Sequence, residues 1–187
     1  MEAHGFARKC DCVTRPPSRQ ISIAPMNPQT PDQSVVTLHQ LMLPEHANQL
    51  NNVHGGVIMK IMDEAGAICA MRHAHHACVT IAIDSMSFHS PVRVGQLLCC
   101  QGRVTWVGRT SIEVEVQVHA EDVIQGTVTH TNSGHLVYVA LDETRQPTLV
   151  PPLLVESEED KRAYAEAVAR RLQRLKSQLQ PLSLRPV

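Results

Sequence analysis

Apolar residues recur with two different periods along the middle of the chain. From residue 56 to residue 72 they follow the helical i, i+3, i+4, i+7 spacing, in the order Ile58, Ile61, Met62, Ala65, Ile68 and Cys69. From residue 111 to residue 120 they alternate with polar residues, which predicts a strand with Ile112, Val114, Val116 and Val118 facing inward and Ser111, Glu113, Glu115 and Gln117 facing outward. Further strands are predicted at residues 35–43, 79–88, 96–107 and 134–141.

The predicted order is therefore one strand, one helix and then four strands. Gly108 and Arg109 are typical of a hairpin turn, and the polar residues 122–132 predict a longer connection before the last strand. Because only the first connection holds a helix, the sheet is mostly antiparallel and can wrap around that helix, which is an α+β architecture. A ferredoxin-like α+β domain is the alternative, but it needs a second helix between the strands, and the pattern predicts none.

A second stripe of the predicted helix is rich in small residues. It contains Gly56, Lys60, Asp63, Gly66, Ala67 and Ala70. Glycine at position 66 lowers helix propensity by roughly 1 kcal/mol relative to alanine, so we expect a close contact with another part of the backbone to compensate. We therefore expect Asp63 to point into a tight seam.

The chain divides into four regions. Residues 1–33, with prolines and no packing pattern, are expected to form a disordered tail, and Met26 is an alternative to Met1 as the native start. Residues 34–152 form the domain, residues 153–180 a C-terminal helix with acidic residues near its start and basic residues near its end, and residues 181–187 a second disordered tail.

Composition excludes several classes of function. A net charge of −1 and 3% aromatic residues argue against a nucleic-acid partner. No apolar run approaches the ~20 residues of a transmembrane helix, so no membrane insertion is expected. Four of the six cysteines lie in or beside the predicted helix and strands, which fits buried, reduced thiols and a cytoplasmic location, and Cys10 and Cys12 lie in the polar tail. His73, His75 and His76 lack the i, i+4 spacing of a helical zinc site, so no metal is expected.

Several motifs occur together and in order. Asn48 precedes Gly55-Gly56 and Met62-Asp63, and Val79-Thr80 precedes Phe88 and Pro91-Val92. The segments 108–111 (GRTS) and 137–142 (VYVALD) follow. Over residues 35–152 this set resembles the hotdog-fold acyl-CoA thioesterases, the branch of bacterial acyl-CoA thioester hydrolases and cytosolic acyl-CoA hydrolases. The resemblance implies a five-stranded antiparallel sheet wrapped around the central helix.

The resemblance also implies a site and a reaction, the hydrolysis of fatty acyl-CoA to free fatty acid and coenzyme A without a cofactor. Asp63 would be general base or nucleophile, and the sequence leaves both routes open. Asn48 would position water or the carbonyl, with a loop-capping role as the structural alternative. The amides of Gly55 and Gly56 at the helix N-terminus would polarise the thioester carbonyl. His54 stands where many bacterial members have phenylalanine.

Coenzyme A binding is expected at the hairpin. There Arg109, Thr110 and Ser111 offer a guanidinium and two hydroxyls to phosphate, and Arg93 is a second candidate of the same kind. The resemblance implies a homodimer, as part of a homohexamer built as a trimer of dimers, with active sites shared between subunits. Two other functions remain open, a catalytically silent acyl-CoA-binding protein and an enoyl-CoA hydratase, although the hydratase's Asp-His motif is absent around Asp63.

Overall fold

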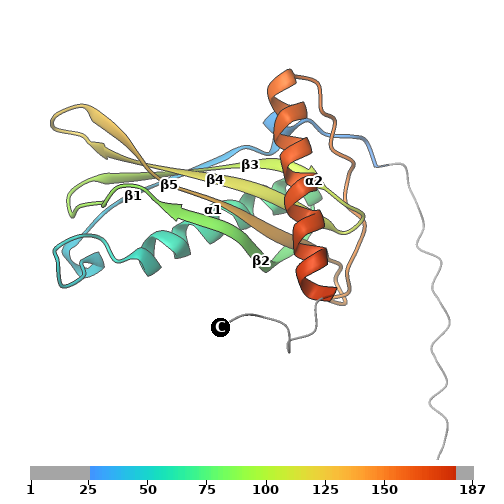
Figure 1. Ribbon diagram of the computed structural model, residues 1–187, viewed down its shortest axis with the longest axis horizontal. Coiled ribbons are helices and arrows are strands. Elements are labelled where there is room, and N and C mark those ends of the chain that lie inside the picture. Colours follow the sequence, from blue (N-terminus) through green and yellow to red (C-terminus); the bar gives the residue numbers. More distant parts are fainter. Residues whose placement is uncertain (1–25, 180–187) are drawn as a thin grey trace, which may run out of the picture.

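One antiparallel sheet organises residues 26–179, which are the residues that the computed structural model describes. Its five strands lie in the order β1-β3-β4-β5-β2, and every neighbouring pair is antiparallel (Figure 1). The strands are β1 (Val36–Leu41), β2 (Ala77–Phe88), β3 (Leu97–Val107), β4 (Ser111–Asp122) and β5 (Thr127–Leu141). The strand, helix, four-strand order predicted from the hydrophobic pattern is confirmed, so β1 and β2 are the edges of the sheet.

The helix α1 (Gly55–Ala74) packs along one face of the sheet, where Figure 1 shows it running beneath the strands. Its apolar side meets the inward-facing residues of β3, β4 and β5 in one core. The helix comes close to β3 at Gly102, where an added Cβ would lie 3.2 Å from the Ala65 carbonyl oxygen. Ile68 departs from the predicted stripe, because 36% of it is exposed on the side of α1 that the sheet does not cover.

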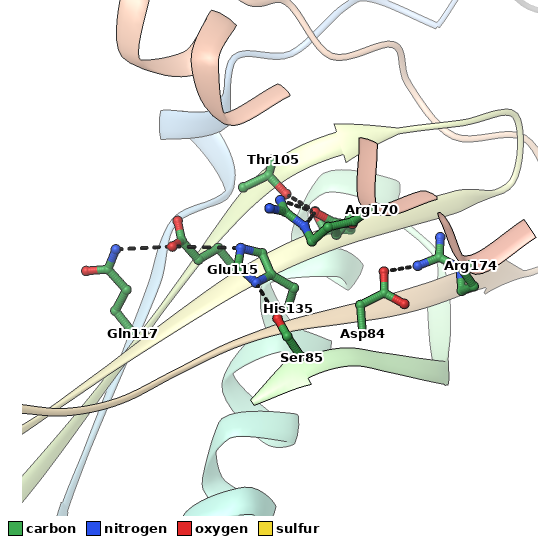
Figure 2. A network of polar contacts seen from close by, with 9 residues as sticks. Asp84, Ser85, Thr105, Glu115, Gln117, His135, Arg170 and Arg174 are labelled. Carbon is green, nitrogen blue, oxygen red and sulfur yellow. Dashed lines mark hydrogen bonds and ion pairs between the residues drawn. The ribbon is translucent and has the colours of Figure 1, made fainter. Parts of the chain in front are cut away.

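The helix α2 (Glu158–Leu179) lies across the opposite face of the sheet (Figure 1). Arg170 donates from Nη2 to Glu113 Oε1 at 2.7 Å, and Arg174 pairs with Asp84 of β2. Figure 2 shows both arginines reaching from α2 toward the strands. The outward side of β4 is therefore covered at Glu113, whose side chain is fully buried.

The connection between β4 and β5 is shorter than the sequence predicted. Residues 122–132 were expected to form a long polar loop, and that expectation is wrong, because β4 ends at Asp122 and β5 begins at Thr127. The Asp122 side chain accepts from two turn amides, and Gly126 takes the positive φ of 67° that the turn needs. This hairpin projects beyond α1 (Figure 1), so its residues 127–130 are exposed on both faces and show no apolar alternation.

The chain before β1 packs on the domain from residue 29 onward. Gln29 forms an isolated β-bridge with Leu153, and a short 3-10 helix (Pro31–Ser34) follows. Residues 29–33 were predicted to belong to the disordered tail. Most of that tail, residues 1–25, and the second tail at residues 181–187 lie outside the described residues. Within residues 26–179, no helix is long and apolar enough to cross a membrane.

The edge strand β2 is unusually apolar for an exposed edge. Val79, Ile81 and Ile83 are each 44–55% exposed. They were predicted to share one face, but that prediction is wrong, because an irregularity at Ile81 puts Val79 opposite Val139 and Ile83 opposite Leu136, on different faces of the sheet. Phe88 at the end of the strand is 51% exposed. An exposed apolar edge with unpaired backbone groups is a typical site for pairing with another strand.

Candidate active site

Asp63 lies near the middle of α1 and is half-buried between the helix and β2. Its Oδ1 accepts a hydrogen bond of 2.6 Å from the Thr80 hydroxyl. Its Oδ2 makes no hydrogen bond within residues 26–179. The carboxylate is therefore held by one oxygen while the other remains available to a ligand or a water molecule.

The predicted close contact at Gly66 exists, but its partner is a side chain and not backbone. A Cβ on Gly66 would lie 2.3 Å from the hydroxyl of Tyr138, a distance that real Cβ atoms do not reach. That hydroxyl lies 3.1 Å from the Asp63 carbonyl oxygen and 3.3 Å from Asp63 Oδ1. Gly66 therefore leaves room for Tyr138, and Asp63 does lie in a tight seam.

Asn48 lies in the loop before α1. Its Oδ1 accepts from the Leu50 amide at 2.8 Å and from the Asn52 amide at 3.3 Å, which is the loop-capping geometry considered above. The Nδ2 group makes no hydrogen bond within the described part of the chain. Capping and a functional role are compatible, because the carbonyl side of the amide holds the loop and the donor side is open.

The N-terminus of α1 presents the two glycines differently. His54 is the N-cap, and its Nδ1 accepts from the Gly56 amide at 3.0 Å. The Gly55 amide makes no hydrogen bond within the described residues. Of the two amides predicted to polarise a carbonyl, only that of Gly55 is therefore unoccupied, and His54 has a capping role that the sequence did not suggest.

These groups form two separate half-sites. The first consists of Asn48, Gly55 and Phe88, which line a pocket of about 320 Å³. The second consists of Asp63, Thr80 and Tyr138. Asp63 follows Gly55 by eight helical residues, a rise of about 12 Å, so the two half-sites of one chain cannot act on the same carbonyl group.

The candidate coenzyme A residues are also far apart. Arg109 is exposed in the hairpin between β3 and β4, beside Thr110 and the first residue of β4, Ser111. It borders an apolar pocket of about 410 Å³ that includes Val107 and Leu153. Arg93 precedes β3 and bridges to Asn52 near the first half-site. The length of β3 separates the two arginines by about 35 Å within one chain.

The three neighbouring histidines have different surroundings. His73 is buried and bonds the Ser34 hydroxyl through Nδ1 and the Pro151 carbonyl through Nε2. His75 ends α1 with a left-handed φ of 54°, and its Nε2 bonds the Gln29 side chain. Over the described range 26–179, no group of three metal-ligating side chains is gathered in one place.

Two residues of the second half-site were not among the predicted site residues. Thr80 and Tyr138 stand inside the motifs at residues 79–80 and 137–142, but neither spacing nor periodicity distinguishes them from ordinary strand residues. Their contacts with Asp63 span 17 and 75 residues of sequence, and only the pairing of β2 with β5 brings them together.

Known proteins similar to this chain share its fold. A family model described as the Thioesterase superfamily matches residues 50–127. The cytosolic acyl coenzyme A thioester hydrolase of Rattus norvegicus is 35% identical over 78% of this chain, which spans only 39% of that relative's length. The crystal structure of an apo-hexameric acyl-CoA thioesterase is 38% identical with a TM-score of 0.79, and the match covers 83% of this chain and 100% of that chain.

An acyl-CoA hydrolase from Staphylococcus aureus, solved with butyryl coenzyme A, coenzyme A and coenzyme A disulfide, is 30% identical with a TM-score of 0.75. The match covers 81% of this chain and 92% of that chain. Further structures of the same enzyme carry alanine in place of an asparagine, an aspartate and a threonine, which follow one another at intervals of 15 and 17 residues. The extent and identity of these matches show that the chain belongs to the thioesterase superfamily, in its hotdog-fold family of acyl-CoA thioester hydrolases.

Proposed function

We propose that this chain hydrolyses acyl-CoA thioesters to a free acid and coenzyme A, with Asp63 as the reacting carboxylate. The observation that carries the proposal is the half-buried Asp63, fixed through Oδ1 by Thr80 and open at Oδ2, in a chain of this family. The intervals Asn48–Asp63 and Asp63–Thr80 are 15 and 17 residues, equal to the intervals between the three substituted positions of the Staphylococcus aureus enzyme.

Two routes fit an open carboxylate oxygen. As a general base, Oδ2 takes a proton from water, and the resulting hydroxide attacks the thioester carbonyl carbon. As a nucleophile, Oδ2 attacks that carbon itself, and water then hydrolyses the mixed anhydride. In both routes the C–S bond breaks and coenzyme A leaves as a thiolate, which takes up a proton. Thiols have a pKa of about 8.5, so this leaving group needs no metal to assist it.

The complete site is proposed to form between two subunits. Thr80 lies near one end of β2 beside Asp63, and Phe88 at the other end lies 3.5 Å from a Cβ built on Gly55. If β2 pairs antiparallel with a second copy about a two-fold axis near Asp84, the Phe88 end of one strand meets the Thr80 end of the other. This pairing brings the first half-site to the partner's Asp63 and covers the exposed apolar edge.

The first half-site then acts on the thioester carbonyl oxygen. The open Gly55 amide at the positive end of α1 donates to that oxygen as negative charge develops on it. The Asn48 Nδ2 group, held in place by the hydrogen bonds of its own carbonyl, donates to the same oxygen or to the attacking water. The Gly56 amide contributes once a ligand replaces the His54 ring as its acceptor.

Coenzyme A phosphates are proposed to bind at Arg109, with Thr110 and Ser111 supplying hydroxyl donors. Arg93 lies too far from Arg109 in one chain for both to hold the same phosphate group, so in this proposal it serves a site near the first half-site. Fatty acyl substrates, a cytoplasmic location and a homohexamer built from dimers complete the proposal. The free thiols of four described cysteines and a cytosolic relative support the location, and a hexameric relative supports the assembly.

The test is release of free thiol from a medium-chain acyl-CoA by the Asp63→Asn variant. This change keeps the size of the side chain and removes the basic oxygen, so kcat should fall by at least about a hundredfold. Glu64→Gln is the matched control, because Glu64 is the next residue of α1 and its exposed carboxylate pairs only with exposed Lys60. Wild-type turnover by Asp63→Asn would refute the mechanism. Binding of acyl-CoA without turnover by the wild-type chain would instead indicate a silent binding protein.

A further inference from the structure

The contacts around Asp63 include a buried hydroxyl that the proposed mechanism does not use. Tyr138 lies on β5 with no exposed surface, and its ring forms part of the core under α1. Its hydroxyl is the only polar atom of that side chain, and it meets two oxygens of one residue, the Asp63 carbonyl at 3.1 Å and Oδ1 at 3.3 Å. Burying a phenol costs free energy unless its hydroxyl is hydrogen-bonded, so this contact accounts for the position of the hydroxyl.

The same contact requires a glycine on α1. A side chain at position 66 would overlap the Tyr138 hydroxyl, since an added Cβ would lie 2.3 Å from the oxygen and 3.0 Å from the ring carbon that carries it. Glycine in the middle of a helix costs roughly 1 kcal/mol relative to alanine. A phenylalanine at position 138 would fill the core without reaching as far, so packing alone does not explain the pairing of Gly66 with a tyrosine.

We propose, on the basis of the proposed function, that Tyr138 is a positioning residue that holds the Asp63 carboxylate through Oδ1 in concert with Thr80. Two hydroxyls from different strands then direct one carboxylate oxygen into the protein. Turning the Asp63 carboxylate about its Cβ–Cγ bond would move Oδ1 away from both hydroxyls. Oδ2 is thereby left in a single orientation for water or for the thioester carbonyl carbon.

The electrostatic surroundings keep Tyr138 a donor. Burial and the adjacent Asp63 carboxylate both raise the pKa of its hydroxyl, so it stays protonated at any working pH. The other titratable group that acts on it is the Cys69 thiol, whose burial raises its pKa to about 12 and leaves it uncharged. Lys60 and Glu64, which flank Asp63 on α1, pair with each other at the exposed surface. Tyr138 therefore keeps the proton with which it can donate to Asp63.

The test compares Tyr138→Phe with Thr129→Val, which removes a hydroxyl from an exposed residue of the same strand, β5. For Tyr138→Phe we expect kcat to fall about tenfold with KM nearly unchanged, because a hydrogen bond to a charged group is lost from the reacting carboxylate and not from substrate binding. Thr129→Val should leave both kcat and KM unchanged.

A second variant tests the contact itself. Gly66→Ala forces the Tyr138 hydroxyl away from Asp63 and should reproduce the loss of kcat with KM nearly unchanged. In a Tyr138→Phe background the same alanine should cost little further activity, so the two effects should not add. Thermal melts of each variant confirm that it is folded.

The outcomes separate this inference from the proposed function. If Asp63→Asn is inactive while Tyr138→Phe keeps the wild-type kcat, the positioning role is wrong and the mechanism stands. If Tyr138→Phe lowers the melting temperature and changes KM as much as kcat, the residue is only structural and the positioning role is wrong. If Asp63→Asn is fully active, both fail.

Discussion

The separation of the two half-sites leads to a prediction about mixed subunits. Asn48→Ala removes the donor of the first half-site, and Asp63→Asn removes the carboxylate of the second. Each variant alone should be nearly inactive. When equal amounts of the two chains are co-expressed, half of the dimers are mixed, and each mixed dimer has one site with both wild-type residues. We expect about a quarter of the wild-type activity to return.

The expectation that two chains share each site follows from the geometry of α1. The Gly55 end of the helix and Asp63 are eight residues apart, about 12 Å along the axis. A thioester carbonyl needs its donor at about 3 Å from the oxygen and the attacking oxygen at about 3–3.5 Å from the carbon. A separation of about 12 Å exceeds both distances together, so the proposed site takes Asn48 from one chain and Asp63 from the other.

The assay is thiol release from a medium-chain acyl-CoA, corrected for the total protein. Its control is co-expression of wild type with the double variant Asn48→Ala/Asp63→Asn. A shared site leaves mixed dimers of that pair inactive, so about a quarter of the activity remains, whereas a site within one chain would leave about half. No recovered activity from the two single variants, together with half activity in the control, would refute the shared site.

Three further predictions concern binding and stability. Arg109→Ala should raise KM for acyl-CoA about tenfold with little change in kcat, because a phosphate contact stabilises ground and transition states alike; unchanged steady-state kinetics would place it outside the site. Arg170→Met should lower the free energy of unfolding by about 3–5 kcal/mol, because it leaves the fully buried Glu113 without its cation, and adding Glu113→Met should restore most of that loss in denaturant titrations. Burial lowers the pKa of His73 from 6.5, so the neutral ring stabilises the fold fully above that pH, and this stabilisation is lost as the pH falls below it. On acidification the melting temperature of the wild type should therefore fall more than that of His73→Gln. Equal falls would show that protonation of His73 does not affect stability.

Periodicity alone established most of the architecture. The helical spacing from residue 56 and the alternation from residue 111 indicate which side of each element faces the core. The helix α1 follows the first pattern except at Ile68, and β4 follows the second. The motif around Asn48, the glycine pair and Asp63 indicated the family, because it joins a helix N-terminus to a carboxylate on the same helix. Both are local properties, so they can be read from neighbouring residues.

Tertiary structure decided what the other faces meet. Glu113 alternates like a solvent-facing residue, yet α2 covers it, since periodicity does not reveal what a later element buries. Thr80 and Tyr138 reach Asp63 only because β2 pairs with β5 beside α1. The helical rise fixes the distance between Gly55 and Asp63. The proposal that two subunits share each site also needs the positions of the open amide, the open carboxylate oxygen and the exposed edge of β2, which only the tertiary structure gives.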